Sequence, residues 1–393
     1  SGMTVYAQSA GGAVGSSERL HIDTRIMNAI HSYAAYLVKT IWPMDLAVFY
    51  PYPGSAPGTV ILLCASLLVL FTLLAVFTWK SRPYLAVGWF WYLGTLVPVI
   101  GIVQVGSQSM ADRYTYIPLI GIFLAMVWGL ADLIGRGRRG RVVLGAVAAA
   151  ALVLLMWAAW IQVGFWRNSE TLFRHTVEVT DNNCMAHYLL GLAICDRGDV
   201  DGAIRQYREC LKIDSRFFPA YLGLGQAYTK KKDTGTASRY YEKGLQIDPD
   251  NPYTLNGRIR YGRLLLELGN LDGAIGHFRK ALSISPHNCD AHASLGNIML
   301  LRGHLDDAIA HYLLALRLSP DGAGLYYNLG NAYSNKGEMG KAITYYEEAV
   351  RRNPDFDKAV KSLSYARNAQ PEVEGSITRL RHLITTRPGD PRP

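Results

Sequence analysis

One short segment combines the residue types that can bind a phosphorylated group. Asp112, Arg113 and Tyr114 follow one another within the stretch Ser107–Pro118. A guanidinium can bind a phosphate through two parallel hydrogen bonds, and a neighbouring carboxylate can act as a base or hold the arginine. An ion pair beside a tyrosine anchor at the lipid headgroup layer has the same composition. The segment is therefore a candidate binding site for a phosphate or pyrophosphate group, with a structural ion pair as the alternative.

A second set of polar residues is expected on the same side of the membrane as this segment. Lys39, Asp45, Tyr50 and Tyr52 lie in or after an apolar stretch that ends near Pro43. Together they can contribute to the same site. Taken singly, each is explained as well by an aromatic, proline-rich loop at the membrane interface.

Other kinds of chemistry find little support. The chain contains no serine–histidine–aspartate order, phosphate loop or nucleophile elbow. His287, Cys289 and His292 provide potential metal ligands but lack a fourth. The cysteine spacing predicts neither a disulfide framework nor a zinc site, and buried thiols acting as small apolar groups are the better reading. We therefore predict no metal site among these residues. No cofactor is evident, and the involvement of a divalent metal is left open.

The elements that must position the candidate site are apolar helices. A membrane span needs about 20 mostly apolar residues, and this condition is met at about 59–78, 84–103, 116–134 and 142–163. These stretches predict a transmembrane domain over 58–165, preceded by an external segment, 1–57. Within that segment, residues 26–42 fit an amphipathic helix in the interface at least as well as a further span.

The basic residues predict the orientation of these spans. Lys80 and Arg82 follow the first span, and four arginines between 136 and 141 follow the third, so both loops are expected in the cytoplasm. The Asp112–Arg113 segment and everything after the fourth span then face the opposite side. This arrangement also accounts for much of the net charge of +9, and no basic motif predicts a nucleic-acid partner.

A different pattern follows Trp166 and recurs with a period of 34 residues, that of the tetratricopeptide repeat (TPR). One unit contains Gly296, Ala308, Tyr312 and Pro320. The small residues should let two helices approach, the aromatic should fill the gap toward the next repeat, and the proline should stop the second helix. One step is longer by about three residues near 251–254. We predict a TPR solenoid over 166–390, with units at about 184–217, 218–251, 255–288, 289–322 and 323–356 and a degenerate cap at 357–390.

Stacked first helices of such repeats form a concave groove. Asparagine and glutamine amides there can bind a peptide backbone, although asparagine is also simply common at this position. The predicted fold is therefore all-α, with polytopic transmembrane helices followed by a TPR α-solenoid that binds a protein or peptide. The groove candidates are Tyr188, Gln226, Arg263, Asn297, Tyr327, Asn331 and Asn335.

Four segments together resemble a known family. They are MADRYTYIP at Met110–Pro118, WPMDLAVFYP at Trp42–Pro51, AQSAGGA at Ala7–Ala13 and WRNSETLF at Trp166–Phe173. Their types and order are similar to those of the bacterial relatives of the transmembrane-and-TPR protein O-mannosyltransferases. The resemblance covers essentially the whole chain.

This resemblance implies a GT-C type membrane glycosyltransferase, which passes a sugar from a polyprenyl-phosphate donor to protein hydroxyls on the outer or luminal side of the membrane. Asp112, Arg113 and Tyr114 are then the candidates for binding the donor phosphate. The repeats would bind the acceptor and Arg113 the departing lipid phosphate. The acidic catalytic loop of the family has no counterpart in this sequence, so we expect the chain to be a C-terminal portion. The expected location is the bacterial inner membrane, with the repeats on its periplasmic or external side. The alternative is a non-catalytic, membrane-anchored TPR scaffold.

Overall fold

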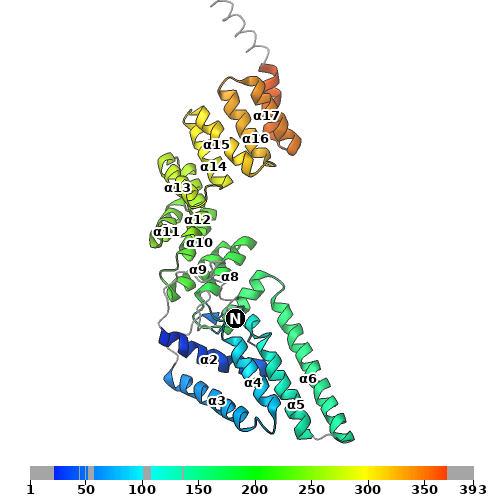
Figure 1. Cartoon of the computed structure of the whole chain (residues 1–393). Helices are drawn as coiled ribbons and strands as arrows, with labels where there is room; N and C mark the ends of the chain where they lie inside the picture. Colours follow the sequence, from blue (N-terminus) through cyan, green and yellow to red (C-terminus); the bar gives the residue numbers. More distant parts are fainter. Residues whose placement is uncertain are drawn as a thin grey trace, which may run out of the picture. The chain divides into compact units, whose positions relative to one another are not determined.

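A computed structural model describes residues 22–43, 45–48, 50–51, 57–100, 108–134 and 137–369 (Figure 1). It divides into two compact units, Ser1–Phe217 and Phe218–Pro393. The first unit therefore extends beyond the apolar region, 58–165, and includes the first repeat. Within the described residues the fold is helical, as predicted, apart from one pair of very short strands.

The described residues of the first unit include five helices up to residue 165. A two-stranded antiparallel sheet and a 3-10 helix lie between them, and Met110 pairs with Tyr50 across the sheet. The elements are α2 (Ile22–Ile41), β1 (Tyr50–Pro51), α3 (Gly58–Phe77), α4 (Pro83–Leu96), β2 (Gln108–Met110), η1 (Asp112–Thr115), α5 (Pro118–Ile134) and α6 (Arg138–Phe165).

Two of these helices, α3 and α6, are long and apolar enough to cross a membrane by length and composition. Most of their large apolar side chains are exposed, and no residue of α6 is buried. The apolar helix α5 is shorter, and α4 ends at Leu96, before the predicted end of the second span near 103. The described residues thus contain two candidate spans where the sequence predicted four.

The core of this first group of helices is aromatic. The side chains of Tyr36, Trp89 and Tyr92 are buried together. Helices α4 and α5 approach closely where Gly88 faces Gly121, since a Cβ atom on either glycine would overlap the backbone of the other. Close contact through small residues is a common way for apolar helices to associate without a hydrophobic driving force.

Three further helices complete the first unit: α7 (Ser169–Val179), α8 (Cys184–Arg197) and α9 (Val200–Ile213). Helix α7 follows α6 after only three residues, and the Asn168 side chain caps it by accepting from the Thr171 N–H at 2.8 Å. The Phe165 ring at the end of α6 stacks on His175 of α7, with ring centroids 3.7 Å apart. The junction between α6 and α7 is thus packed as well as short.

The second unit consists of successive helical hairpins. They are followed by a helix over 357–369, the part of the predicted cap that the structure describes. The additional residues predicted near 251–254 form the 3-10 helix η2 (Pro252–Thr254). The hairpin helices are α10 (Phe218–Lys230), α11 (Thr234–Ile247), α12 (Leu255–Glu267), α13 (Leu271–Ile284), α14 (Cys289–Leu301), α15 (Leu305–Leu318), α16 (Ala323–Asn335) and α17 (Met339–Arg352).

The glycines and aromatic residues of the repeat pattern meet inside each hairpin. A Cβ atom on Gly296 would lie 2.7 Å from the ring of Tyr312, and one on Gly262 would lie 2.9 Å from Phe278. The aromatic ring therefore lies against the glycine of its own repeat, which corrects the expectation that it mainly fills the gap toward the next repeat. Only a residue without a side chain fits such a close-packed position.

Candidate functional site

Helix α2 holds the segment that leads into Asp112. The Tyr36 hydroxyl donates to the Ala111 carbonyl oxygen and accepts from the Ala111 N–H, both at 3.0 Å. About two turns earlier on α2, the Asn28 Nδ2 group donates to the Ser109 carbonyl oxygen at 3.1 Å. Because Tyr36 and Asn28 are buried, these bonds are shielded from water. The backbone immediately before Asp112 is therefore fixed in position.

Strand β1 brings the second set of predicted residues to the same segment. The Ser109 hydroxyl donates to the Tyr50 carbonyl oxygen at 3.2 Å. Lys39 Nζ donates to the Asp45 carbonyl oxygen at 2.8 Å and lies 4.6 Å from the centre of the Tyr50 ring, a cation–π distance. Lys39, Asp45 and Tyr50 thus form one cluster next to the sheet of β1 and β2; their part in a binding site stays a prediction. Tyr52 lies outside the described residues.

The donor phosphate candidates occupy η1, between the fixed strand β2 and the start of α5. The structure describes the backbone of Asp112 and Arg113, while their side chains lie outside the described part of the chain. Tyr114 is half-buried, and its N–H donates to the Ala111 carbonyl oxygen at 3.0 Å. The phosphate-binding role of these three residues stays a prediction.

In the second unit, the first helices of neighbouring repeats touch, since α10 contacts α12, α12 contacts α14 and α14 contacts α16. Two predicted groove asparagines are held on this set of helices by aromatic hydroxyls. The Asn297 Oδ1 atom accepts from the Tyr312 hydroxyl at 2.7 Å and from Asn328 Nδ2 at 3.2 Å. The Asn331 Oδ1 atom accepts from the Tyr346 hydroxyl at 2.8 Å.

These bonds orient both amides. Because the oxygen of each amide is engaged, each keeps an NH₂ group that can donate to the carbonyl oxygens of an extended peptide. The sequence identified Asn297 and Asn331 but missed Asn328 and the two tyrosine hydroxyls. The pairing spaces the tyrosine 15 residues after its asparagine in both repeats, so this spacing is a signal that the sequence does contain.

The other groove candidates have different surroundings. Arg263 forms an ion pair with Asp290 at 2.9 Å, which links α12 to α14. Tyr327 packs against Phe356 with ring centroids 5.1 Å apart. Gln226 is half-buried, and Asn335 is exposed at the end of α16. These candidates share the second unit with Asn297 and Asn331.

Tyr188 is the exception among the seven, because it lies on α8 in the first unit. Its ring packs against Tyr207 and Phe217, with centroids 6.0 Å and 5.4 Å away. The same position in the fifth repeat is Tyr327, whose ring packs in the same way against Tyr346 and Phe356. The shared packing identifies both tyrosines as structural parts of their repeats as well as groove candidates.

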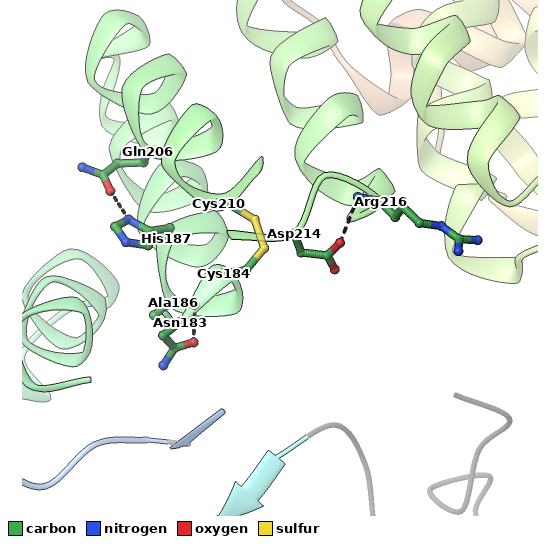
Figure 2. Close-up of a disulfide and its surroundings, with 8 residues drawn as sticks. All are labelled: Asn183, Cys184, Ala186, His187, Gln206, Cys210, Asp214 and Arg216. Carbon is green, nitrogen blue, oxygen red and sulfur yellow. Dashed lines mark hydrogen bonds between the residues drawn. A yellow bond between two sulfur atoms is a disulfide. The ribbon is translucent and has the colours of Figure 1, made fainter. Parts of the chain in front are cut away.

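A disulfide joins Cys184 at the start of α8 to Cys210 near the end of α9 (Figure 2). The cysteine spacing had not indicated any disulfide, so this prediction was wrong. A signal exists in the repeat frame, because Cys289 and Ala315 occupy the same two positions of a later repeat. There the Cys289 thiol reaches the Ala315 carbonyl oxygen at 3.5 Å. Two cysteines at these positions therefore face each other.

Comparison with known protein families agrees with this architecture. Models described as TPR repeat match residues 191–232 and 296–337, and models described as tetratricopeptide repeat match 216–287, 265–314 and 323–356. Residues 191–356 are tetratricopeptide repeats. The stacked first helices of this TPR array, with their oriented amides, are therefore a candidate surface for a protein or peptide.

Among curated proteins, the chain is similar to protein O-mannosyl-transferase TMTC1 of Homo sapiens, at 29% identity over 203 residues. This match covers 51% of the chain and 21% of that protein. TMTC4 of Homo sapiens is 29% identical over 98 residues, which cover 25% of the chain and 13% of TMTC4. Drosophila melanogaster Tmtc3 is 23% identical over 163 residues, which cover 40% of the chain and 17% of Tmtc3. The chain is thus related to these TPR-containing proteins, but the matches span only 13% to 21% of their length.

Among solved structures, the TPR protein YrrB, described as having an unusual peptide-binding site, aligns with a TM-score of 0.42 at 22% identity. The alignment covers 48% of this chain and 96% of YrrB. A MamA protein aligns with a TM-score of 0.39 at 24% identity, covering 45% of this chain and 95% of MamA.

Proposed function

We propose that the chain is the C-terminal portion of a membrane glycosyltransferase, of GT-C type, that transfers a sugar from a polyprenyl-phosphate donor to protein hydroxyls. The observation that supports this most directly is the fixed backbone at Ala111, which α2 holds on both its N–H and its carbonyl oxygen. A site that stabilises developing charge needs such preorganised positioning. The relation to protein O-mannosyl-transferases supplies the reaction class.

The apolar helices support a location in a membrane, proposed to be the bacterial inner membrane. Helices α3 and α6 expose long apolar surfaces that water would disfavour and hydrocarbon would accept. We propose that α4 and α5, with the turns next to them, complete a set of four spans. Lys80, Arg82 and the arginines at the start of α6 then lie in the cytoplasm.

The disulfide supports the same orientation from independent chemistry. Structural disulfides persist in oxidising compartments such as the periplasm and are rare in the cytoplasm. The bond between Cys184 and Cys210 lies in the repeat that follows α6. The repeats are therefore proposed to face the periplasm, on the same side as the Asp112–Arg113 segment.

In the proposed reaction, a carboxylate from the preceding part of the protein takes the proton of the acceptor hydroxyl. The resulting oxygen attacks the anomeric carbon of the sugar as the bond from that carbon to the phosphate oxygen breaks. Negative charge develops on the departing polyprenyl phosphate, where the Arg113 guanidinium would bind it. Tyr114 and Asp112 would hold the arginine and the phosphate in place.

The TPR array would bind the acceptor protein. The oriented amides of Asn297, Asn328 and Asn331 can hold an extended segment by its backbone carbonyl groups without reading its side chains. Backbone recognition suits an enzyme that modifies hydroxyls in many sequences. Arg263 and Tyr327 would add contacts that depend on the side chains of the acceptor.

The test is a transfer assay on the full-length gene product with a radiolabelled lipid-linked sugar. Arg113→Ala is compared with Arg138→Ala, which removes an arginine from the opposite side of the membrane. We expect Arg113→Ala to lower transfer by a factor of about 100–1,000, the usual effect of losing one donor to a developing charge, and Arg138→Ala to retain it. Equal transfer by Arg113→Ala and the unmodified protein would refute the assigned role. Absence of transfer by the unmodified protein would favour the scaffold.

A further inference from the structure

An apolar cavity of about 470 Å³ lies among helices α2, α3, α4 and α5. Leu37 and Ile41 line it from α2, Leu67 and Leu74 from α3, and Met126 from α5. Its size falls within the usual range for a small-molecule site, roughly 300–1,000 Å³. The lining is almost entirely apolar; Thr40 is the main polar exception, and its hydroxyl already donates to the Tyr36 carbonyl oxygen at 2.7 Å. Such a lining suits a hydrocarbon chain.

A second cavity of about 350 Å³ adjoins the first on α2 and α3. It is lined by His31, Lys39 and Asp45 together with Cys64 of α3. Val38 borders both cavities. The two together therefore present an apolar wall followed by a polar, charged wall along the same pair of helices.

The order of these walls along α3 matches the layers of a membrane. Helix α3 begins at Gly58, so Cys64 lies about 9 Å along its axis, and Leu67 to Leu74 lie about 14–24 Å along it at 1.5 Å per residue. With Gly58 at the outer surface, as in the proposed orientation, the polar cavity lies near the outer headgroup layer. The apolar cavity then lies within the hydrocarbon.

The charged groups of the polar cavity have opposite signs. Lys39 Nζ is kept in place by the Asp45 carbonyl oxygen at 2.8 Å and by the Tyr50 ring. An ammonium group can bind the phosphate of a lipid head, and a carboxylate can accept hydrogen bonds from a primary amine. A purely anionic head group would meet the Asp45 carboxylate, and a choline head group has no N–H to donate.

We propose that the two cavities form one binding site for a glycerophospholipid that carries a primary amine, such as phosphatidylethanolamine. One acyl chain occupies the apolar cavity, the phosphate lies beside Lys39, and the amine lies beside Asp45. This inference rests on the membrane location within the proposed function and is independent of sugar transfer.

The test measures which lipid the full chain retains. Protein purified in mild detergent is exposed to mixed micelles that contain equal amounts of phosphatidylethanolamine, phosphatidylglycerol, phosphatidylcholine and undecaprenyl phosphate. Native mass spectrometry then identifies and quantifies each bound lipid by the mass that it adds to the protein. We expect phosphatidylethanolamine to be the main lipid retained. Val38→Trp should reduce its retention by about tenfold, which corresponds to about 1.4 kcal/mol of binding free energy, because the indole fills the junction of the cavities.

The matched control is Val69→Trp, which adds the same side chain on α3 at a residue that lines neither cavity and is 57% exposed. It should retain lipid as the unmodified protein does. Asp45→Asn should remove the preference for phosphatidylethanolamine over phosphatidylcholine while the total lipid retained changes little, since the apolar cavity is intact.

Three results would overturn the inference: equal retention of all four lipids, preferential retention of undecaprenyl phosphate, or equal effects of Val38→Trp and Val69→Trp. Alkaline carbonate washing of the membranes separates this inference from the membrane location. A chain released by the wash would refute the location itself. A chain that stays in the membrane fraction without enriching phosphatidylethanolamine would refute only the lipid site.

Discussion

Replacing Gly296 by alanine tests the contact on which each repeat hairpin depends. A Cβ atom at this position would lie 2.7 Å from Cε1 and 2.8 Å from Cδ1 of Tyr312. The ring has little freedom to move, because it is fully buried and its hydroxyl donates to Asn297 Oδ1. Overpacking of this kind costs about 1–3 kcal/mol.

Gly276→Ala is the matched control, since Gly276 lies on an exposed part of α13 and a Cβ atom there meets nothing within 4 Å. Both substitutions gain about 1 kcal/mol of helix propensity. The difference between their free energies of unfolding therefore isolates the steric cost, which we expect to be about 1–3 kcal/mol. Alone, Gly276→Ala should stabilise its hairpin.

Hydrogen exchange of the full chain, followed by mass spectrometry, measures this difference helix by helix. Amides of α14 and α15 should exchange roughly 5- to 150-fold faster in Gly296→Ala than in Gly276→Ala, the factor that corresponds to about 1–3 kcal/mol. The excess should shrink when Tyr312→Phe is added, because the ring is then no longer held by its hydroxyl. Equal exchange in the two glycine variants would refute the close contact between the ring and the glycine.

Three further predictions follow from other contacts. Replacing Cys184 and Cys210 together by alanine opens a link that spans 26 residues, so protection of α8 and α9 should fall by about 3.5 kcal/mol on the loop-closure estimate; a reducing agent should have the same effect on the unmodified protein and none on the variant. Burial and a neighbouring imidazole hold the pKa of His311 below its usual 6.5, so the unfolded chain binds more protons and the free energy of unfolding should fall as the pH drops below about 6.5. Thermal unfolding at about pH 7 and about pH 5 measures this dependence, which His311→Gln should weaken. Tyr36→Phe leaves both backbone groups of Ala111 without the hydroxyl and should cost about 1–3 kcal/mol, lowering sugar transfer by full-length protein, whereas an unchanged rate would show that the bond does not position the site.

The repeat architecture was predictable because its information is local. The spacing of Gly296, Ala308 and Tyr312 within one hairpin predicts two packed helices, and the long step near 251 predicts the position of η2. The link between Tyr36 and Ala111 joins residues 75 positions apart and has no periodic signal. Its partner is a backbone group, which any residue type supplies, so the sequence could not indicate it.

The disulfide and the oriented amides were less predictable than the repeat helices but more predictable than the bond between Tyr36 and Ala111. Each depends on two positions of the repeat frame that meet in space, so each can be read once the hairpin geometry is known. Cysteine spacing alone did not show that the start of α8 faces the end of α9. The asparagines alone likewise indicated polar residues in the groove, but not the orientation of their amides. That orientation depends on a tyrosine 15 residues later, whose hydroxyl donates to the amide oxygen.

The stacked junction of Phe165 and His175 has a consequence for the direction in which the first repeat points. A flexible linker would let the repeat rotate freely about the axis of α6. The packed junction instead fixes this rotation, so the direction of the repeat depends on the length of α6. Each residue inserted into α6 would turn the attached repeat by about 100° and raise it by about 1.5 Å, and seven residues would nearly restore the original bearing. The length of α6 thus sets the direction in which the first repeat points as well as its height above the start of the helix.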